Sequence, residues 1–481
     1  MSKKTKRSIS TFAILLAVLL LVSIATWIAA GKTYTGEDGE IAEVVGATSS
    51  DIFMAPVNGW ADAADVITFV FCLGAFLAIV NATGALETGI HTLVRRLHGK
   101  ELALIWILMF VFSIGGTTYG MGEETVGFYI LLAATMMAAG FDPIVGAATV
   151  LLGAGTGVLG STINPFATGA AVAAATSVGV EVNMGTTYVL GIVLWLLTYV
   201  LSALFVTAYA KRVRANKGSI LTAAQLDECQ KAYGGKDVTT AKLTGRQKAV
   251  LWLFALSFVV MILGFIPWGS LSETMYNAFS SSTTWLTGAC LGDWWFYDAA
   301  TWFLLMGIII GIVGLEDKGQ LMKLIANGFG DMVSVNLVIA MARATSVIMA
   351  ATGLGTWLVE ASVTALSQSG VSAGVFGLLD YILHVGLSFL VPSSSGLAGL
   401  SAPIVSPIVA GMGWSVETSI MINVAANGFV NLFTPTCGFI MGGLALARVP
   451  YESWLKWAWK LLVALFVVVG VVLTIAMAVL S

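Results

Sequence analysis

The chain alternates between apolar segments of helical length and short polar or glycine-rich breaks along nearly all of its 481 residues. Membrane β-strands would instead alternate apolar and polar positions over about ten residues. The observed pattern predicts an all-α polytopic membrane protein with about eleven spanning or interrupted helices. Two further units have apolar arms that are too short to cross a bilayer, and these predict re-entrant hairpins.

The first predicted hairpin surrounds residues 115–124, which include four glycines and two adjacent carboxylates. Its arms, residues 102–112 and 126–139, are apolar. They would rise about 16 to 21 Å, short of the roughly 30 Å hydrocarbon core. Irregular backbone at that depth is tolerated only where it is buried in protein or lines a wet cavity, so this tip is a candidate binding site.

Three other breaks interrupt apolar sequence farther along the chain. Each contains a proline, which ends or kinks a helix because it lacks a backbone N–H group. They are the break at 160–165 within a span at 145–177, the break at 392–399 between hairpin arms at 375–391 and 401–412, and the break at 431–437 within a span at 419–447. We therefore predict a second hairpin and two broken spans.

Basic clusters at residues 3–7, 91–100 and 211–217 identify the segments expected on the cytoplasmic side of the membrane. The first apolar segment, residues 11–30, is long for the core of a cleaved signal peptide. We therefore predict a retained span, a cytoplasmic N-terminus and a location in the bacterial inner membrane. The acidic segment at 36–65 then lies outside.

The polar segments divide the rest of the chain. We expect an external loop at 269–298, an amphipathic segment at the inner interface at 316–331, and a continuous span at 337–366. The expected units are first-repeat scaffold helices at 1–101, a hairpin and broken helix of the transport domain at 102–178, a closing helix at 179–217, a cytoplasmic linker at 218–248, a connecting helix and second-repeat scaffold at 249–370, the second hairpin and broken helix of the transport domain at 371–447, and a closing helix at 448–481.

Two short patterns recur in the same order in the two halves. The tripeptide Ala-Thr-Gly at 82–84 returns 269 residues later at 351–353, and the helix break at Asn164-Pro165 returns 270 residues later at Thr434-Pro435. The basic clusters place the two hairpins on opposite sides of the membrane, which predicts inverted repeats. Inverted-repeat carriers bind substrate near the midplane, where discontinuous helices meet.

Composition narrows the class of protein. With 58% hydrophobic and 10% charged residues, the chain has too little polar surface for a soluble globule of its size. The four cysteines lack the spacing of a metal site or a disulfide framework, and nothing indicates nucleic-acid binding. No Ser-His-Asp spacing, paired-aspartate motif or His-Glu-x-x-His sequence supports an enzyme, and no sizeable soluble domain supports a receptor.

Candidate binding residues of the first tip are Thr117, Thr118, Glu123 and Glu124. Neighbouring side chains on a helix diverge by about 100°, so we expect one of the two carboxylates to face the ligand. The other would interact with a helix start, where the macrodipole favours an anion. In the alternative interpretation, both carboxylates cap the helix or pair with buried donors.

The second tip offers Ser393, Ser394, Ser395 and Gly396. Their backbone N–H groups can bind a carboxylate at a helix N-terminus. Serines in membrane helices also serve close packing. We predict the binding role because Pro392 and the glycines disfavour a continuous helix.

Amide and hydroxyl groups accompany both broken spans. Their expected roles are hydrogen bonds to substrate from Asn164, Asn431 and Thr434, and oxygen coordination of Na⁺ near Gly116, Ser161, Thr162, Asn164, Asn427 and Thr436. In the alternative interpretation, the asparagines satisfy backbone groups that are freed by the breaks. No other cofactor is expected, and the coupling ion is either Na⁺ or H⁺.

Four other ionisable residues fall at apparent membrane depth. They are Arg343, Glu360, Asp380 and His384. We expect Arg343 to pair with one of the two acids. An Arg343 that reached the site instead would favour an acidic substrate, and His384 suits either a structural role or a proton relay.

Four motifs resemble the YfcC-type branch of the C4-dicarboxylate anaerobic carrier family over nearly the whole chain. They are GGTTYGMGEE at 115–124, INPFATG at 163–169, PSSSGLAGLSAP at 392–403 and NLFTPT at 431–436. The resemblance implies membership of the ion transporter superfamily, whose members are typically dimeric elevator carriers with a scaffold and a moving transport domain. Members of this family are dicarboxylate carriers or basic amino acid exchangers.

These observations predict a secondary active transporter with a small-molecule substrate, embedded in lipid as a homodimer. Acids at one tip and a serine-rich helix start at the other favour a basic or zwitterionic amino acid of the arginine or ornithine type, moved by ion-coupled transport or by antiport. The alternatives are a C4-dicarboxylate carrier coupled to Na⁺ or H⁺, and a channel built from the same broken helices.

Overall fold

A computed structural model describes residues 11–36, 40–86, 88–89, 92, 100–215, 218–233 and 243–481. Within these residues, ten helices are long and apolar enough to cross a membrane. They are α1 (Thr11–Ala29), α3 (Ala64–Ala82), α5 (Glu101–Tyr119), α9 (Met184–Arg214), α11 (Gly245–Phe265), α14 (Phe296–Gly314), α15 (Leu321–Thr352), α17 (Ala373–Leu390), α18 (Ser394–Gly411) and α21 (Tyr451–Leu480). The predicted helical membrane protein is confirmed. The basic clusters at 3–7 and 91–100, apart from Thr92 and Lys100, lie outside the described residues.

Shorter elements complete the described fold. The helices among them are α2 (Ser49–Asp62), α6 (Val126–Ala138), α7 (Pro143–Leu159), α8 (Ala170–Ser177), α10 (Ala223–Tyr233), α12 (Trp268–Leu271), α13 (Glu273–Ser282), α16 (Leu354–Gln368), α19 (Val416–Val430), α20 (Gly438–Leu446), and the brief turns η1 (Glu123–Thr125), η2 (Pro165–Gly169) and η3 (Lys318–Gln320). One antiparallel strand pair, β1 (Thr33–Thr35) with β2 (Ile41–Glu43), is an exception to the expected all-α fold.

The two broken spans interrupt their helices where the sequence predicts. The first runs from α7 through η2 to α8, because Pro165 cannot continue a helix and the Asn164 side chain accepts the Phe166 N–H instead. The second consists of α19 and α20, separated by the segment that contains Pro435. Gly428 of α19 lies against the backbone of Leu159 in α7. The helices that precede the two breaks are therefore in backbone contact near their ends.

The chain turns between α5 and α6 and between α17 and α18 as expected, but the breaks are shorter than predicted, and α5, α17 and α18 are long enough to cross a membrane. The re-entrant course of the two hairpins stays a prediction. Helix α5 continues through residues 115–119 and ends only at Gly120, whose φ of 78° is in the left-handed region that favours glycine. Gly116 has no room for a Cβ atom because it lies against the backbone of α7. Helix α18 begins at Ser394, so residues 394–399 are helical as well. The glycines here serve close packing more than chain breaking.

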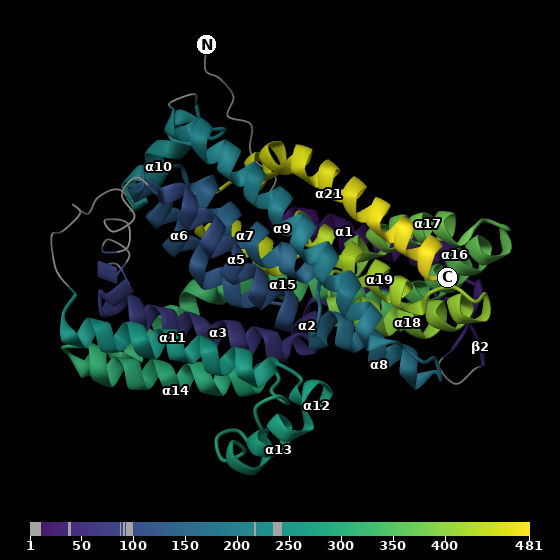
Figure 1. The fold of residues 1–481 in the computed structure, drawn as a ribbon, viewed down its shortest axis with the longest axis horizontal. Coiled ribbons are helices and arrows are strands. Elements are labelled where there is room, and N and C mark those ends of the chain that lie inside the picture. The colour runs from purple at the N-terminus through teal and green to yellow at the C-terminus, as the bar shows by residue number, and fades with distance from the viewer. Residues whose placement is uncertain are drawn as a thin grey trace.

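Helix α3 packs between α14 and α15, and α11 packs on α14 (Figure 1). Helices α16–α19 lie toward the opposite end of the molecule (Figure 1). Gly74 of α3 and Gly328 of α15 bring those two helices into backbone contact. Short helices α12 and α13 protrude beyond the body of the bundle (Figure 1).

Three connecting segments differ from the expectation. The acidic segment 36–65 is not simply a loop, because it contains β2 and α2, and α2 packs along α15. The linker 218–248 contains α10. The segment expected at the inner interface is largely the first part of α15, which then ends at Thr352. Gly353, at φ 70°, turns the chain into α16 within the expected span 337–366.

The two Ala-Thr-Gly segments occupy equivalent local positions. Helix α3 ends at Ala82 with Gly84 at φ 65°, and α15 ends at Thr352 with Gly353 at φ 70°. This shared helix ending agrees with an internal repeat at one point of the chain. The inverted orientation of the repeats and the boundaries of the scaffold and transport units stay predictions.

Candidate functional site

A cavity of about 140 Å³ lies where the two hairpin tips, both broken helices, α14 and α15 come together. Its polar lining comes from segments that are far apart in the sequence. The residues that carry polar side chains there are Asp65, Glu123, Glu124, Trp295, Arg343, Ser393, Ser394, Ser395, Asn431, Thr436 and Cys437. The cavity therefore combines both predicted tips with residues that the sequence did not place together.

The first tip contributes two carboxylates in different surroundings. Glu124 is 2% exposed, and its Oε2 accepts the Gly122 N–H at 3.0 Å. Glu123 is half-buried in the cavity wall. Glu124 thus closes the tip onto its own backbone, while Glu123 remains more open to a ligand.

The second tip presents the start of α18 to the cavity. Ser393 caps the helix by accepting the Gly396 N–H at 3.2 Å, and Ser394 Oγ donates to Asn427 Oδ1 at 2.8 Å. The N–H groups of Ser394 and Ser395 have no intrahelical acceptor at this position. They are the donors that an anion at a helix N-terminus uses.

Asn427 of α19 and Asn431, which directly follows that helix, support the second tip. Asn431 Nδ2 donates to Pro392 O at 2.9 Å, and Asn427 Nδ2 donates to the carbonyls of Val391 and Pro392 at 3.3 and 3.2 Å. Both amides therefore satisfy backbone carbonyls at the break. Asn431 Oδ1 is buried without a hydrogen-bond partner in the described chain, so it is an acceptor available to a ligand.

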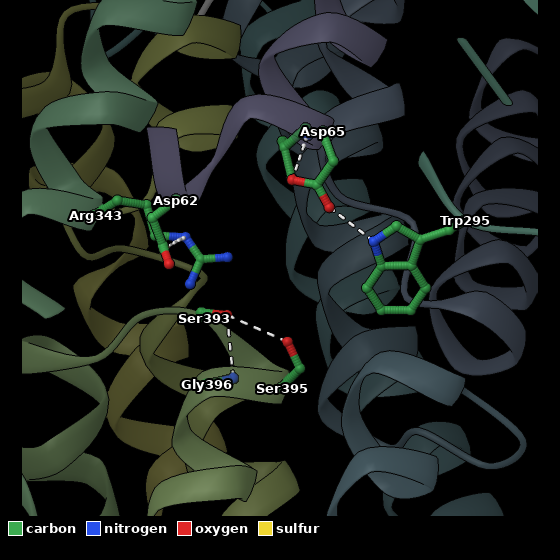
Figure 2. Close-up of polar contacts among 8 residues, drawn as sticks. Asp62, Asp65, Trp295, Arg343, Ser393, Ser395 and Gly396 are labelled. Carbon is green, nitrogen blue, oxygen red and sulfur yellow. Dashed lines mark hydrogen bonds and ion pairs between the residues drawn. The ribbon is translucent and has the colours of Figure 1, made fainter. Parts of the chain in front are cut away.

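Arg343 lines the same cavity, and its partner differs from the prediction. Its Nε lies 3.5 Å from Asp62 Oδ2 at the end of α2. The expected pairing with Glu360 or Asp380 is wrong: Glu360 accepts hydrogen bonds from Thr35 of β1, and Asp380 lies beside His384. Figure 2 shows the rest of the guanidinium group pointing into the space above Ser393 and Ser395. Its terminal nitrogens are placed to meet a carboxylate.

Asp65 and Trp295 form the opposite wall. Trp295 Nε1 donates to Asp65 Oδ2 at 2.7 Å (Figure 2). The Val66 N–H donates to the other carboxylate oxygen, Oδ1, at 2.8 Å. The Trp295 ring lies 4.6 Å from the Phe166 ring, centroid to centroid. These aromatic rings, a carboxylate and Glu123 together suit a cationic or amino group. In the sequence, Asp65 and Trp295 stand out only as polar residues beside apolar helices, because their contact joins distant segments of the chain.

The remaining predicted residues of the first half surround the cavity rather than line it. Thr117 Oγ1 donates to Gly160 O at 2.8 Å, and Thr162 Oγ1 donates to Thr117 O at 3.0 Å. Asn164 Nδ2 donates to Ser161 Oγ at 2.9 Å, and its amide lies against Gly120 of the tip. Thr118 is half-buried and donates to Ile114 O.

In the second half, Thr434 is buried and lies 2.7 Å from Thr436, hydroxyl to hydroxyl. Thr436 and Asn431 line the cavity, whereas Asn427 and Gly396 support its wall. The expected Na⁺ ligands thus lie in two groups, one at each helix break. Their binding roles and a Na⁺ site stay predictions.

A helical membrane fold with a polar cavity at its helix breaks is typical of a membrane transporter. Residues 9–478 match the family model of the C4-dicarboxylate anaerobic carriers, which are membrane transporters. The chain belongs to the C4-dicarboxylate anaerobic carrier family, in its YfcC-type branch.

Two curated relatives span most of the chain. An uncharacterized protein of Haemophilus influenzae is 29% identical over 430 residues, which are 88% of this chain and 78% of the relative. YfcC of Escherichia coli, whose full name proposes basic amino acid antiport, is 28% identical over 425 residues, which are 85% of this chain and 77% of the relative.

Among solved structures, the fold is similar to that of the YdaH transporter of Alcanivorax borkumensis. The TM-score is 0.50 at 17% identity, and the match covers 97% of this chain and 98% of that chain. This likeness concerns the fold alone.

Proposed function

We propose that the protein is a secondary active transporter for a basic or zwitterionic amino acid of the arginine or ornithine type. One observation carries the proposal: the cavity has opposite charges on its two sides. Arg343 and the start of α18 lie at one side, Asp65 and Trp295 lie at the other, and Glu123 also lines the cavity. A zwitterion matches both sides, with its carboxylate on the first and its amino or guanidino group on the second.

The size of the cavity supports a small metabolite. Its volume of about 140 Å³ is below that of most drug-sized sites, which begin at about 300 Å³. The name of YfcC, which proposes basic amino acids as its substrates, supports the same substrate class. Transport is either ion-coupled, to Na⁺ or H⁺, or an exchange of two substrates.

The two hairpins and two broken spans would move against the remaining helices in an elevator-type transport cycle, within a homodimer of the inner membrane. This mechanism is supported by the meeting of both tips at one cavity and by the expected inverted repeats. The cytoplasmic location of the N-terminus rests on the basic clusters.

A C4-dicarboxylate is the second candidate. It is favoured by the family to which the chain belongs and by Arg343, which can bind a carboxylate in bidentate geometry. The acids of the first tip then need a bound cation or a proton, because they would otherwise repel the second carboxylate of the substrate.

The test is uptake into proteoliposomes with labelled arginine, ornithine, succinate and fumarate, under Na⁺ and pH gradients that are imposed separately. Saturable uptake of a basic amino acid with counterflow supports the proposal. Selective dicarboxylate uptake would overturn the substrate assignment. Non-saturating flux without counterflow would indicate a channel instead of a carrier.

A further inference from the structure

A buried chain of polar side chains lies inside the second hairpin, away from the cavity. Asp380 and His384 of α17 are 0% and 1% exposed. Asp380 Oδ1 lies 2.9 Å from His384 Nδ1, and His384 Nε2 lies 3.0 Å from Ser401 Oγ of α18. Asn423 of α19 donates from Nδ2 to the same serine oxygen at 2.6 Å. Three helices therefore share one polar network.

The carboxylate of Asp380 is poorly satisfied for a buried group. Neither oxygen has a hydrogen bond of good geometry within the described chain, although Oδ1 lies beside the imidazole ring. An isolated charge at this depth is costly, so the pair is stable in apolar surroundings only when its net charge is zero. Zero net charge requires one proton, shared as carboxylate with imidazolium or as carboxylic acid with neutral imidazole.

The hydrogen bonds around His384 can accommodate either arrangement. Its Nδ1 lies near both the Asp380 carboxylate and the Asp380 carbonyl oxygen, at 3.0 Å from the latter, so Nδ1 bears a hydrogen. A neutral ring accepts from the Ser401 hydroxyl at Nε2, because Asn423 already donates to that oxygen. An imidazolium ring donates to Ser401 instead. A change of protonation therefore reverses the hydrogen bond between the two arms of the hairpin.

The charged residues of the neighbouring helices are engaged elsewhere. Glu360 of α16 accepts hydrogen bonds from Thr35, and Glu417 of α19 accepts from the Asn183 N–H and Ser415 Oγ. Helix α18 has no charged residue, and those of α21 lie in its first three turns. Within the described chain, His384 is thus the basic partner assigned to Asp380.

A row of three asparagines extends from the pair toward the cavity. Asn423 and Asn427 of α19 and Asn431, which directly follows the helix, are spaced by four residues and lie along one face. The first binds Ser401, the second accepts from Ser394 and the third lines the cavity. The protonation state of His384 can therefore affect the tip that faces the substrate.

We propose that Asp380 and His384 form the binding site of a coupling proton, which moves with the second hairpin. The inference rests on the proposed transport function and names its coupling ion. The pair takes up one proton when it is exposed on one side of the membrane. It crosses as a neutral pair and releases the proton on the other side. The deprotonated pair carries a negative charge and does not cross, so substrate and proton move together.

Arginine accumulation by wild-type proteoliposomes, measured at a clamped membrane potential, tests this coupling. A lower pH outside than inside should raise the internal arginine concentration by up to about tenfold per pH unit, which is the limit for one linked proton. An absent or opposite response overturns the inference. If arginine shows no counterflow at equal pH, the proposed substrate is wrong. The same accumulation measurement with succinate then tests whether transport is coupled to a proton.

Substitutions of Asp380 and His384 test whether these two residues bind the coupling proton. With one pH unit imposed, the ratio of pH-driven accumulation to equal-pH exchange should fall by up to about tenfold in Asp380→Asn and in His384→Gln, because one linked proton is lost. Asp142→Asn is the matched control: Asp142 is also buried, but it accepts from Tyr209, Ser219 and the Val145 N–H. Its ratio should stay at the wild-type value. Equal ratios in all three variants overturn the assignment.

The proton site can also be tested without a transport assay and without changing Asp380 or His384, which matters if those two variants fail to fold. The chain has three histidines, so His91→Gln with His98→Gln leaves His384 as the sole imidazole. Nitrogen-15 NMR of histidine-labelled protein should show two protonation forms of that ring between about pH 5 and pH 9. A single unchanging form over this range overturns the proton site.

Discussion

The two hairpin tips occupy comparable places beside the cavity, yet they are built from different chemistry. The first ends α5 at a left-handed glycine and presents Glu123 and Glu124. The second begins α18 at Ser394, with Ser393 as its cap, and presents serines and backbone N–H groups without an acid. The comparison indicates that a repeated architecture can hold a site of opposite polarity at its two sides.

The two tips are also held differently. Gly116 and Thr117 fasten the first tip to the backbone of the broken α7 span. The second is held by side-chain amides, since Asn427 and Asn431 donate to the carbonyl of Pro392. Backbone packing gives a stiff support, whereas a few hydrogen bonds can rearrange. The second tip is therefore the one that we expect to respond to substrate and proton.

The largest effect is expected at Arg343, which decides the polarity of the cavity. Arg343→Gln removes the charge that meets the substrate carboxylate and should lower arginine affinity about 100-fold, or about 2.7 kcal/mol. Binding to purified protein by calorimetry measures it. Arg212→Gln, an exposed change in the last turn of α9, is the control and should bind normally. Unchanged affinity in Arg343→Gln would place the carboxylate elsewhere.

A smaller and more selective effect is expected at the first tip. Glu123→Gln should weaken arginine binding about 30-fold, because a charge-assisted contact to the guanidinium is lost. Glu124→Gln should weaken it less, since an amide oxygen can still accept the Gly122 N–H. Competition binding with arginine and succinate separates the two. If neither change alters arginine binding or ion dependence, both acids are structural.

The sequence predicted those features that depend on local chemistry. The helices follow from their apolar length, and the breaks near Pro165 and Pro435 follow from the missing proline N–H. Glycine was ambiguous, because the same residue ends a helix at Gly120 and packs inside one at Gly116. Only the neighbouring helix distinguishes these two uses.

The polar contacts across the site could not be predicted in this way. Arg343 pairs with Asp62, and Trp295 with Asp65, over 281 and 230 residues of chain. No local pattern specifies such partners. The serine tip and the acidic tip were identified from composition alone, while Asp65 and Trp295 became visible only when the helices were packed.

Substitutions of one asparagine at each break test whether the two tips are held in different ways. Asn427→Ala leaves the carbonyl of Val391 without its side-chain donor and removes one of the two donors to the Pro392 carbonyl, so it should weaken arginine binding about tenfold. Asn164→Ala removes the cap of the Phe166 N–H and should mainly lower stability, by about 1 kcal/mol. Binding and thermal unfolding, measured on both variants, separate the roles. Equal losses of affinity would show that both breaks control the site alike.

The smallest effect concerns a single backbone group of the serine tip. Ser394→Ala removes the hydroxyl that donates to Asn427, whereas Ser394→Pro removes the backbone N–H as well. Proline suits the first position of a helix, and the extended Ser393 before it, at ψ 125°, is compatible with a following proline. Arginine should bind about fivefold more weakly to Ser394→Pro than to Ser394→Ala if this N–H meets the carboxylate. Equal binding would assign the carboxylate to Arg343 alone, and the second tip would then act through its position instead of its helix start.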